Sequence, residues 1–171
     1  QDAHDGDLLE HYATSQLAIV NQHAAAALGG DDGAFVMPIG KPAMFDRVDA
    51  SPDGLFLLVE VVERPFSLIV PLERFPGATL LLGIDGKELR VIDRHRLQDT
   101  VPIGGVPKGP RQVQWVPTLE HALCWTEAQD GGDPRVDVPF RDDVFLLVEP
   151  EGAPRRWYRT GQRAGRLSFA A

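Results

Sequence analysis

Hydrophobic residues in this chain come in short runs that are separated by glycine, proline and aspartate. The runs at 55–62, 80–84 and 144–149 have the length of β-strands and lie next to turn signals. Asp85-Gly86 follows one run, and Asp-Gly readily adopts the positive φ that a primed hairpin turn needs. Ser51-Pro52-Asp53-Gly54 suits a type I turn, in which proline is favoured at the second position and glycine at the fourth. The pattern predicts β-hairpins.

These hairpins repeat with one layout: strand, tight turn, strand, long loop, strand, tight turn, strand. One copy covers about residues 44–93 and a second covers about residues 111–160. Four antiparallel strands per repeat is the plan of a propeller blade. Residues 16–40 are then expected to form the outer hairpin of a preceding blade, residues 165–171 the first strand of the next blade, and residues 1–15 an N-terminal segment.

The predicted fold is therefore all-β: an incomplete propeller within one domain, 1–171, with two full four-stranded antiparallel blades and parts of two neighbours. Evenly spaced strands also fit a β-sandwich or an irregular barrel, which remain alternatives. The one helix candidate, Ala24–Leu28, is too short to predict a stable helix. Trp115, Trp125 and Trp157 fall on predicted strands and are expected to pack between blades.

Composition excludes several classes of function. The formal net charge is −8, which argues against a nucleic-acid partner because such a partner needs a basic face. No run approaches the ~20 apolar residues that span a membrane. Cys124 lies in an apolar run and is expected to be a buried, inert thiol, and one cysteine leaves the compartment undetermined. Asp130, Asp133 and Asp137 miss the spacing of an EF-hand, and neither a metal site nor a cofactor is predicted.

The long connections are predicted to share one rim of the fold, at about 63–76, 94–110 and 129–142. Insertions that gather on one face usually mark the binding face. These connections and the strands beside them carry the arginines that we assign to substrate binding or domain docking: Arg64, Arg74, Arg111, Arg135 and Arg141, with Arg94, Arg96 and Lys108 nearby. A guanidinium fork matches a carboxylate, and the alternative is that these arginines pair with neighbouring acidic residues to hold the loops.

An ordered set of motifs resembles the amino-terminal propeller of glutamyl endopeptidases, a branch of the prolyl oligopeptidase family of serine peptidases. The motifs include residues 10–18, Ser51-Pro52-Asp53-Gly54, Arg64-Pro65-Phe66-Ser67, residues 101–104 and residues 130–136. The Ser-Pro-Asp-Gly turn alone is common in propellers, so the likeness depends on the ordered set. It extends from about residue 9 to the end of the chain.

The resemblance implies a propeller followed by an α/β-hydrolase domain, which bears a Ser-Asp-His triad and cleaves peptides after acidic residues. This chain has no G-x-S-x-G nucleophile elbow, so no catalytic residue is predicted in it. We expect a non-catalytic propeller segment that gates and lines access to a hydrolase domain of the same parent protein. The alternatives are a stand-alone interaction module completed by self-association through open sheet edges, and a propeller glycosidase, which would need paired carboxylates facing a pore.

Overall fold

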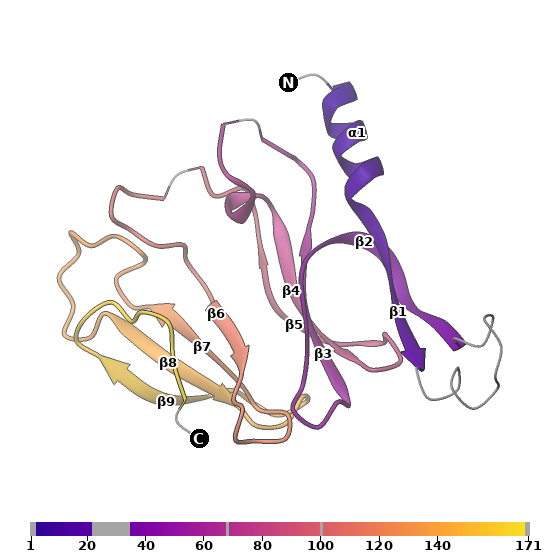
Figure 1. Cartoon of the computed structure of the whole chain (residues 1–171). Coiled ribbons are helices and arrows are strands. Elements are labelled where there is room, and N and C mark those ends of the chain that lie inside the picture. The colour runs from indigo at the N-terminus through magenta and orange to yellow at the C-terminus, as the bar shows by residue number, and fades with distance from the viewer. Residues whose placement is uncertain (1–2, 22–34, 68, 100, 170–171) are drawn as a thin grey trace.

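The computed structural model describes residues 3–21, 35–67, 69–99 and 101–169. These residues form two antiparallel sheets and one α-helix, which confirms the all-β prediction (Figure 1). The strand order is β1-β2-β3-β4-β5 in the first sheet and β6-β7-β8-β9 in the second. The elements are α1 (Ala3–Ala13), β1 (Thr14–Asn21), β2 (Phe35–Ala50), β3 (Phe56–Val62), the 3-10 turn η1 (Leu72–Arg74), β4 (Gly77–Gly83), β5 (Glu88–His95), β6 (Arg111–Trp115), β7 (Leu123–Ala128), β8 (Asp142–Leu147) and β9 (Arg155–Thr160).

Within each sheet, every strand pairs with the strand that follows it in the chain, as the predicted turns require. The Gly54 amide donates to the Ser51 carbonyl at 2.9 Å, and Gly54 has a φ of +73°. Gly86 has a φ of +80°, as the Asp85-Gly86 turn predicts. The second half of β2 and the strands β3 to β5 follow one another along residues 44–95, and β6 to β9 lie within residues 111–160.

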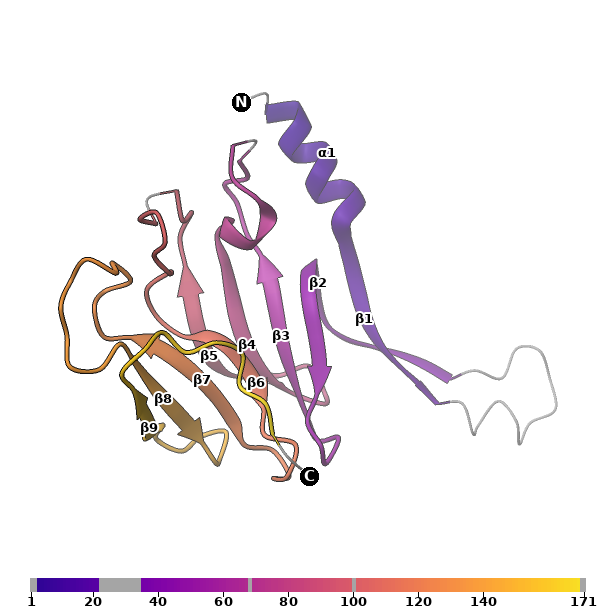
Figure 2. The same ribbon diagram turned by 60° about the vertical axis from the view of Figure 1, so that its left-hand side comes forward.

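The main core lies between the two sheets. Successive side chains of a strand point to opposite faces, so Leu58 faces the second sheet while Leu57 and Val59 face away from it. The buried residues of this core are Leu58 and Leu81 from the first sheet and Val113, Leu123, Trp125 and Leu147 from the second. The sheets thus pack face to face (Figure 2), an arrangement consistent with successive blades of an incomplete propeller.

The short turns of the two sheets meet on one rim, which we call the turn rim: residues 51–55, 84–87, 116–122 and 148–154. The Asp53 amide donates to the Glu120 carbonyl at 3.0 Å. His121 Nδ1 lies 2.7 Å from Asp53 Oδ2, and its Nε2 lies 3.2 Å from Glu149 Oε2. The hydrogen bond to Asp53 raises the pKa of His121, and the Ser51 hydroxyl and His121 lower the pKa of Asp53 to about 2 against the opposing effect of burial. This cluster ties one sheet to the other.

The hairpin expected in a separate blade at 16–40 lies instead in the first sheet. β1 pairs with the first half of β2, and β2 then continues without interruption to pair with β3. Pro38 and Pro42 fall in the half of β2 that pairs with β1 alone, where a strand tolerates proline. A register shift between Ser15 and Leu17, together with Gly40 at a φ of +65°, accommodates the irregular pairing.

The two ends of the chain also differ from expectation. Residues 3–13 form α1, which the sequence did not predict. Residues 165–169 have no regular secondary structure, although Leu167 and Phe169 cover the outer face of the second sheet beside Cys124. The helix candidate Ala24–Leu28 and residues 170–171 lie outside the described residues. No helix of the described part is long and apolar enough to cross a membrane.

Candidate functional site

Three long connections gather at the end of the sheets opposite the turn rim, and we call this end the loop rim: residues 63–67, 69–76, 96–99, 101–110 and 129–141 (Figures 1 and 2). Backbone hydrogen bonds join the connections to one another. The Gln98 amide donates to the Arg74 carbonyl at 2.9 Å, and the Val106 amide donates to the Gly132 carbonyl at 3.0 Å. The predicted separation of short and long connections is therefore confirmed.

Arg64 is the loop-rim arginine that meets α1. Its Nε and Nη2 donate to Glu10 Oε2 at 2.9 and 2.7 Å, and its Nη2 donates to Asp7 Oδ1 at 2.6 Å. The guanidinium also lies 5.1 Å from the centre of the Phe66 ring. The hydrogen bonds that Arg64 donates to Glu10 and Asp7 raise the pKa of Arg64, so the group stays charged.

Arg74 ends the 3-10 turn η1, and its backbone carbonyl anchors the neighbouring connection through Gln98. The described part of the chain offers the half-buried Arg74 side chain no ion pair or side-chain hydrogen bond. The same holds for the exposed Arg96. Arg94, which lies between them in sequence, pairs with Glu63 at 2.5 Å. Arg74 and Arg96 are therefore the rim arginines whose side chains have no carboxylate partner in the described part of the chain.

Arg135 is the most exposed of the predicted arginines, with 82% of its side chain accessible. Its Nε and Nη2 donate to the two carboxylate oxygens of Asp133, which is two residues away. Hydrogen bonds from Arg135 lower the pKa of Asp133 to about 2. The pair is local, so it holds the shape of one loop.

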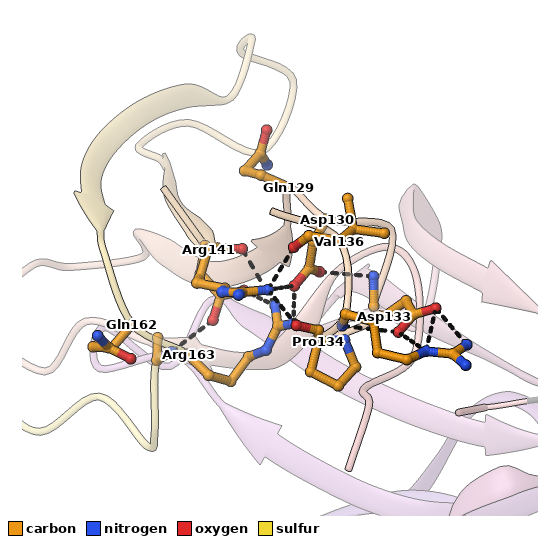
Figure 3. A network of polar contacts seen from close by, with 12 residues as sticks. Gln129, Asp130, Asp133, Pro134, Val136, Arg141, Gln162 and Arg163 are labelled. Carbon is orange, nitrogen blue, oxygen red and sulfur yellow. Dashed lines mark hydrogen bonds and ion pairs between the residues drawn. The ribbon is translucent and has the colours of Figure 1, made fainter. Parts of the chain in front are cut away.

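Arg141 belongs to a buried ion-pair network, which consists of Asp130, Arg141, Arg163, Asp142 and Arg111 and which we call the Asp130 network. Asp130 Oδ2 accepts hydrogen bonds from Arg141 at 2.9 Å and from Arg163 at 2.5 Å (Figure 3). Arg141 also donates to the carbonyls of Pro134 and Val136, which fixes the course of the loop. Burial by itself raises the pKa of Asp130, but the two arginines and the Gly132 amide outweigh it and lower that pKa below its ordinary value.

Asp142 continues the same network toward the second sheet. Its side chain is fully buried, and its Oδ1 accepts hydrogen bonds from Arg111 at 2.8 Å and Arg163 at 2.7 Å. Its Oδ2 accepts from the Ala164 amide at 2.6 Å. The Nε of Arg111 is buried without a hydrogen-bond partner among the described residues. Arg111 and Arg141 are therefore enclosed by the fold, and their charges are satisfied within the second sheet and its loop.

The sequence did not indicate Arg163, which bridges both buried aspartates. The sequence did contain a signal for a cationic partner. Asp130 and Asp142 lie at the two ends of the loop that joins β7 to β8, beside apolar strands, and a carboxylate that is buried there needs a cationic partner. Three cationic side chains serve these two carboxylates. Only the structure shows that the third comes from the segment after β9.

The exposed cations of the rim surround a pocket of about 540 Å³ between the first long connection and the end of β5. Arg64, Arg94, His95 and Arg96 line it, and Glu63 is the acidic residue in its wall. His95 is held by Asp93 at 3.0 Å and by the Phe75 carbonyl at 3.0 Å, and the bond to Asp93 raises the pKa of His95. The pocket has the chemistry to bind carboxylates.

Cys124, the tryptophans and the acidic residues are the remaining candidates for chemistry. Cys124 is fully buried, and burial raises the pKa of its thiol to about 11, so the predicted inert thiol is confirmed. Trp115 and Trp125 pack in the core between the sheets, whereas Trp157 is half exposed on β9 and stacks on Phe169. Within the described residues, no three His, Cys, Asp or Glu side chains form a group that could hold a metal ion.

Comparison with known proteins finds relatives among plant proteins. The chain is 40% identical over 148 residues to "Probable glutamyl endopeptidase, chloroplastic" of Oryza sativa subsp. japonica, in an alignment that covers 85% of the chain and 15% of that protein. It is 36% identical over 174 residues to the protein of the same name from Arabidopsis thaliana, with 99% of the chain and 17% of that protein covered. No family model matches the chain, and no solved structure matches it.

The chain thus spans less than a fifth of the length of the curated relatives it matches. Their names support a relationship to peptidases. The expected resemblance to glutamyl endopeptidases is confirmed at the level of sequence homology.

Proposed function

We propose that this chain is a non-catalytic propeller segment of a serine peptidase of the prolyl oligopeptidase type. In this proposal it gates and lines the approach to an α/β-hydrolase domain of the same parent protein, which cleaves peptides beside acidic residues. The observation that carries the proposal is the match of 85% and 99% of the chain to a segment of two proteins named as probable glutamyl endopeptidases. Two packed antiparallel sheets with the three connections of the loop rim at one end agree with it.

The loop rim is the surface proposed to face the hydrolase domain. Arg111 and Arg141 stabilise this rim from within, since their donors are directed at buried carboxylates. Arg135 shapes its own loop through Asp133. Arg74 and Arg96 have donors without a carboxylate partner in the described part of the chain, so we propose that these two attract the acidic side chains of a peptide.

The reading frame that encodes this chain gives the first test. We expect it to encode a Gly-x-Ser-x-Gly elbow in a hydrolase domain. A reading frame without such a domain would overturn the proposal. The isolated chain should not hydrolyse a fluorogenic peptide that contains glutamate, whereas the full-length protein should.

The role of the two arginines is tested in the full-length protein with Arg74→Gln and Arg96→Gln combined. We expect kcat/KM to fall about 10-fold for a glutamate peptide and to stay unchanged for the glutamine peptide of the same sequence. Arg155→Gln, at the turn-rim end of β9, is the matched control and should leave both values unchanged. Equal losses on both peptides would assign these arginines to the structure of the rim.

A second candidate function, an interaction module completed by self-association, rests on the outer face of the first sheet. An open pocket of about 580 Å³ lies there, and the half-buried apolar side chains of Leu17, Phe45, Val61 and Leu80 line it. A second copy of the chain would cover such a face. Sedimentation velocity over a range of concentrations tests this: a dimer supports self-association, and a monomer throughout the range rejects it.

A further inference from the structure

Helix α1 stands beside the loop rim and projects beyond the end of the first sheet (Figures 1 and 2). Two of its carboxylates, Asp7 and Glu10, lie three residues apart and therefore on one face of the helix. Both converge on the single guanidinium of Arg64, at 2.6 and 2.7 Å from its Nη2. Arg64 is thus a receptor for two carboxylates of one helical turn.

Apolar burial contributes little to the docking of α1. Its large apolar side chains are Leu8, Leu9 and Tyr12, which are 39%, 39% and 81% exposed. Gly6 lies within the helix, where glycine is unfavourable compared with alanine. A helix with so little buried apolar surface is held chiefly by its ion pairs, which are weak at an exposed site and are screened by salt.

Arg64 is held in place more firmly than helix α1 is. The guanidinium of Arg64 lies over the Phe66 ring, and Phe66 is buried against Phe75. Arg64 also lines the pocket of about 540 Å³, whose wall includes Arg94, His95 and Arg96. An acidic helix that reached Arg64 would therefore meet further cations beside it.

We propose that Arg64 and its pocket form a docking site for an acidic helix with carboxylates three residues apart, and that α1 occupies this site in cis. An acidic helix of a partner protein then binds in trans by displacing α1. The proposal concerns a protein-docking surface and does not depend on peptidase activity. It rests on the contacts of Arg64 and on the weak apolar anchoring of α1.

The test uses the full chain and a fluorescein-labelled, end-capped peptide that copies residues 3–13, with binding followed by fluorescence anisotropy. Asp7→Asn combined with Glu10→Gln removes the cis carboxylates, and with them the ion pairs that hold α1 at Arg64, without shortening the chain. We expect this variant to bind the peptide about 10-fold more tightly than the unaltered chain, because the competing ligand is gone. Adding Arg64→Met to it should abolish the gain, and raising the salt concentration should weaken binding.

Two controls keep the result specific to this site. Arg135→Met, added to the same D7N/E10Q variant, removes an exposed arginine from the same rim and should leave peptide binding unchanged. A peptide copy that carries Asn and Gln at the positions of Asp7 and Glu10 should not bind. No binding to the D7N/E10Q variant at about millimolar peptide, or binding that survives Arg64→Met, overturns the proposal.

The substitution Gly6→Ala should have the opposite effect on peptide binding and so provides an independent test. A Cβ at this position would lie 3.4 Å from Arg64 Nη1 and 3.6 Å from Phe66 Cδ2, which is close to ordinary contact. Alanine favours the helix, so α1 should dock more firmly and the trans peptide should bind several-fold more weakly than to the unaltered chain. Tighter binding of the peptide to this variant contradicts the proposal.

Discussion

At the scale of single residues, Asp130 is the carboxylate on which the long connection at 129–141 depends. It is fully buried and serves Arg141 and Arg163, which come from the loop itself and from the segment after β9. Asp130→Ala leaves both guanidinium groups without this partner in a largely desolvated site. We expect the free energy of unfolding to fall by about 3 kcal/mol, measured by urea denaturation.

The matched control is Asp133→Ala in the same loop. Its partner Arg135 is 82% exposed, so water replaces the lost contact and the denaturation midpoint should stay within experimental error. Equal effects of the two substitutions would show that the Asp130 network contributes no more than a surface pair.

His121 makes the junction of the two sheets sensitive to pH. Asp53 and Glu149 raise its pKa, so its contribution to stability is full below the ordinary histidine value near 6.5 and is lost as the pH rises through the raised value. The pKa of Asp53 is lowered to about 2, so its contribution is present above the ordinary aspartate value and falls only in strong acid. His121→Gln should therefore lower Tm more at about pH 5.5 than at about pH 8.5. The same decrease at both pH values would contradict this assignment.

The loop-rim arginines show how far residue-level prediction from the sequence can reach. Their location on one rim followed from the lengths of the connections, and the alternative that they pair with acidic neighbours holds for Arg135 with Asp133. The partners of Arg64 and Arg111 lie 54 and 31 residues away from them, at Glu10 and Asp142. Such pairs depend on how separate elements pack, which no local pattern encodes.

At the scale of elements, Gly132 is where two connections of the loop rim touch. Its φ is +84°, and a Cβ there would lie 2.1 Å from the Val106 carbonyl oxygen, which is backbone and cannot rotate away. Gly132→Ala should therefore cost about 3 kcal/mol of stability and break the hydrogen bond between Val106 and Gly132. Hydrogen exchange of the Val106 amide measures the second effect.

Gly104→Ala is the control for backbone strain alone. Gly104 has a φ of +71°, but a Cβ there would meet nothing within 4 Å. This substitution should cost only about 1 kcal/mol and leave exchange of the Val106 amide slow. If the two variants behave alike, the close approach at Gly132 has no energetic role.

Prediction of elements from the sequence succeeded where hydrophobic runs are bounded by strong turns, as at Ser51–Gly54 and Asp85-Gly86. It failed for α1, because its large apolar residues Leu8, Leu9 and Tyr12 extend over little more than one turn, which is too short an apolar stripe to predict a helix. It also divided β2, since Pro38, Gly40 and Pro42 are read as breaks. This half of β2 pairs with β1 alone, which allows these residues within a strand. That pairing depends on the tertiary fold and cannot be read from the local sequence.

At the scale of the whole molecule, the two sheets share one core and should unfold together. Leu58 is fully buried at their interface and contacts the second sheet through a cluster that includes Leu123 and Trp125. All three tryptophans of the chain, Trp115, Trp125 and Trp157, belong to strands of the second sheet. Trp115 and Trp125 lie in the shared core, so tryptophan fluorescence reports the separation of the sheets as well as the unfolding of the second sheet, whereas far-UV circular dichroism reports the strands of both sheets.

Leu58→Ala, a change within the first sheet, should lower the free energy of unfolding by about 3 kcal/mol. Because the core is shared, the urea midpoint measured by tryptophan fluorescence should fall as far as the midpoint measured by circular dichroism. Val48→Ala, at an exposed position of the same sheet, should shift neither midpoint appreciably. A fluorescence midpoint that stays in place while the circular dichroism midpoint falls would mean that the sheets are independent units. The second sheet could then hold the Asp130 network in shape without the first.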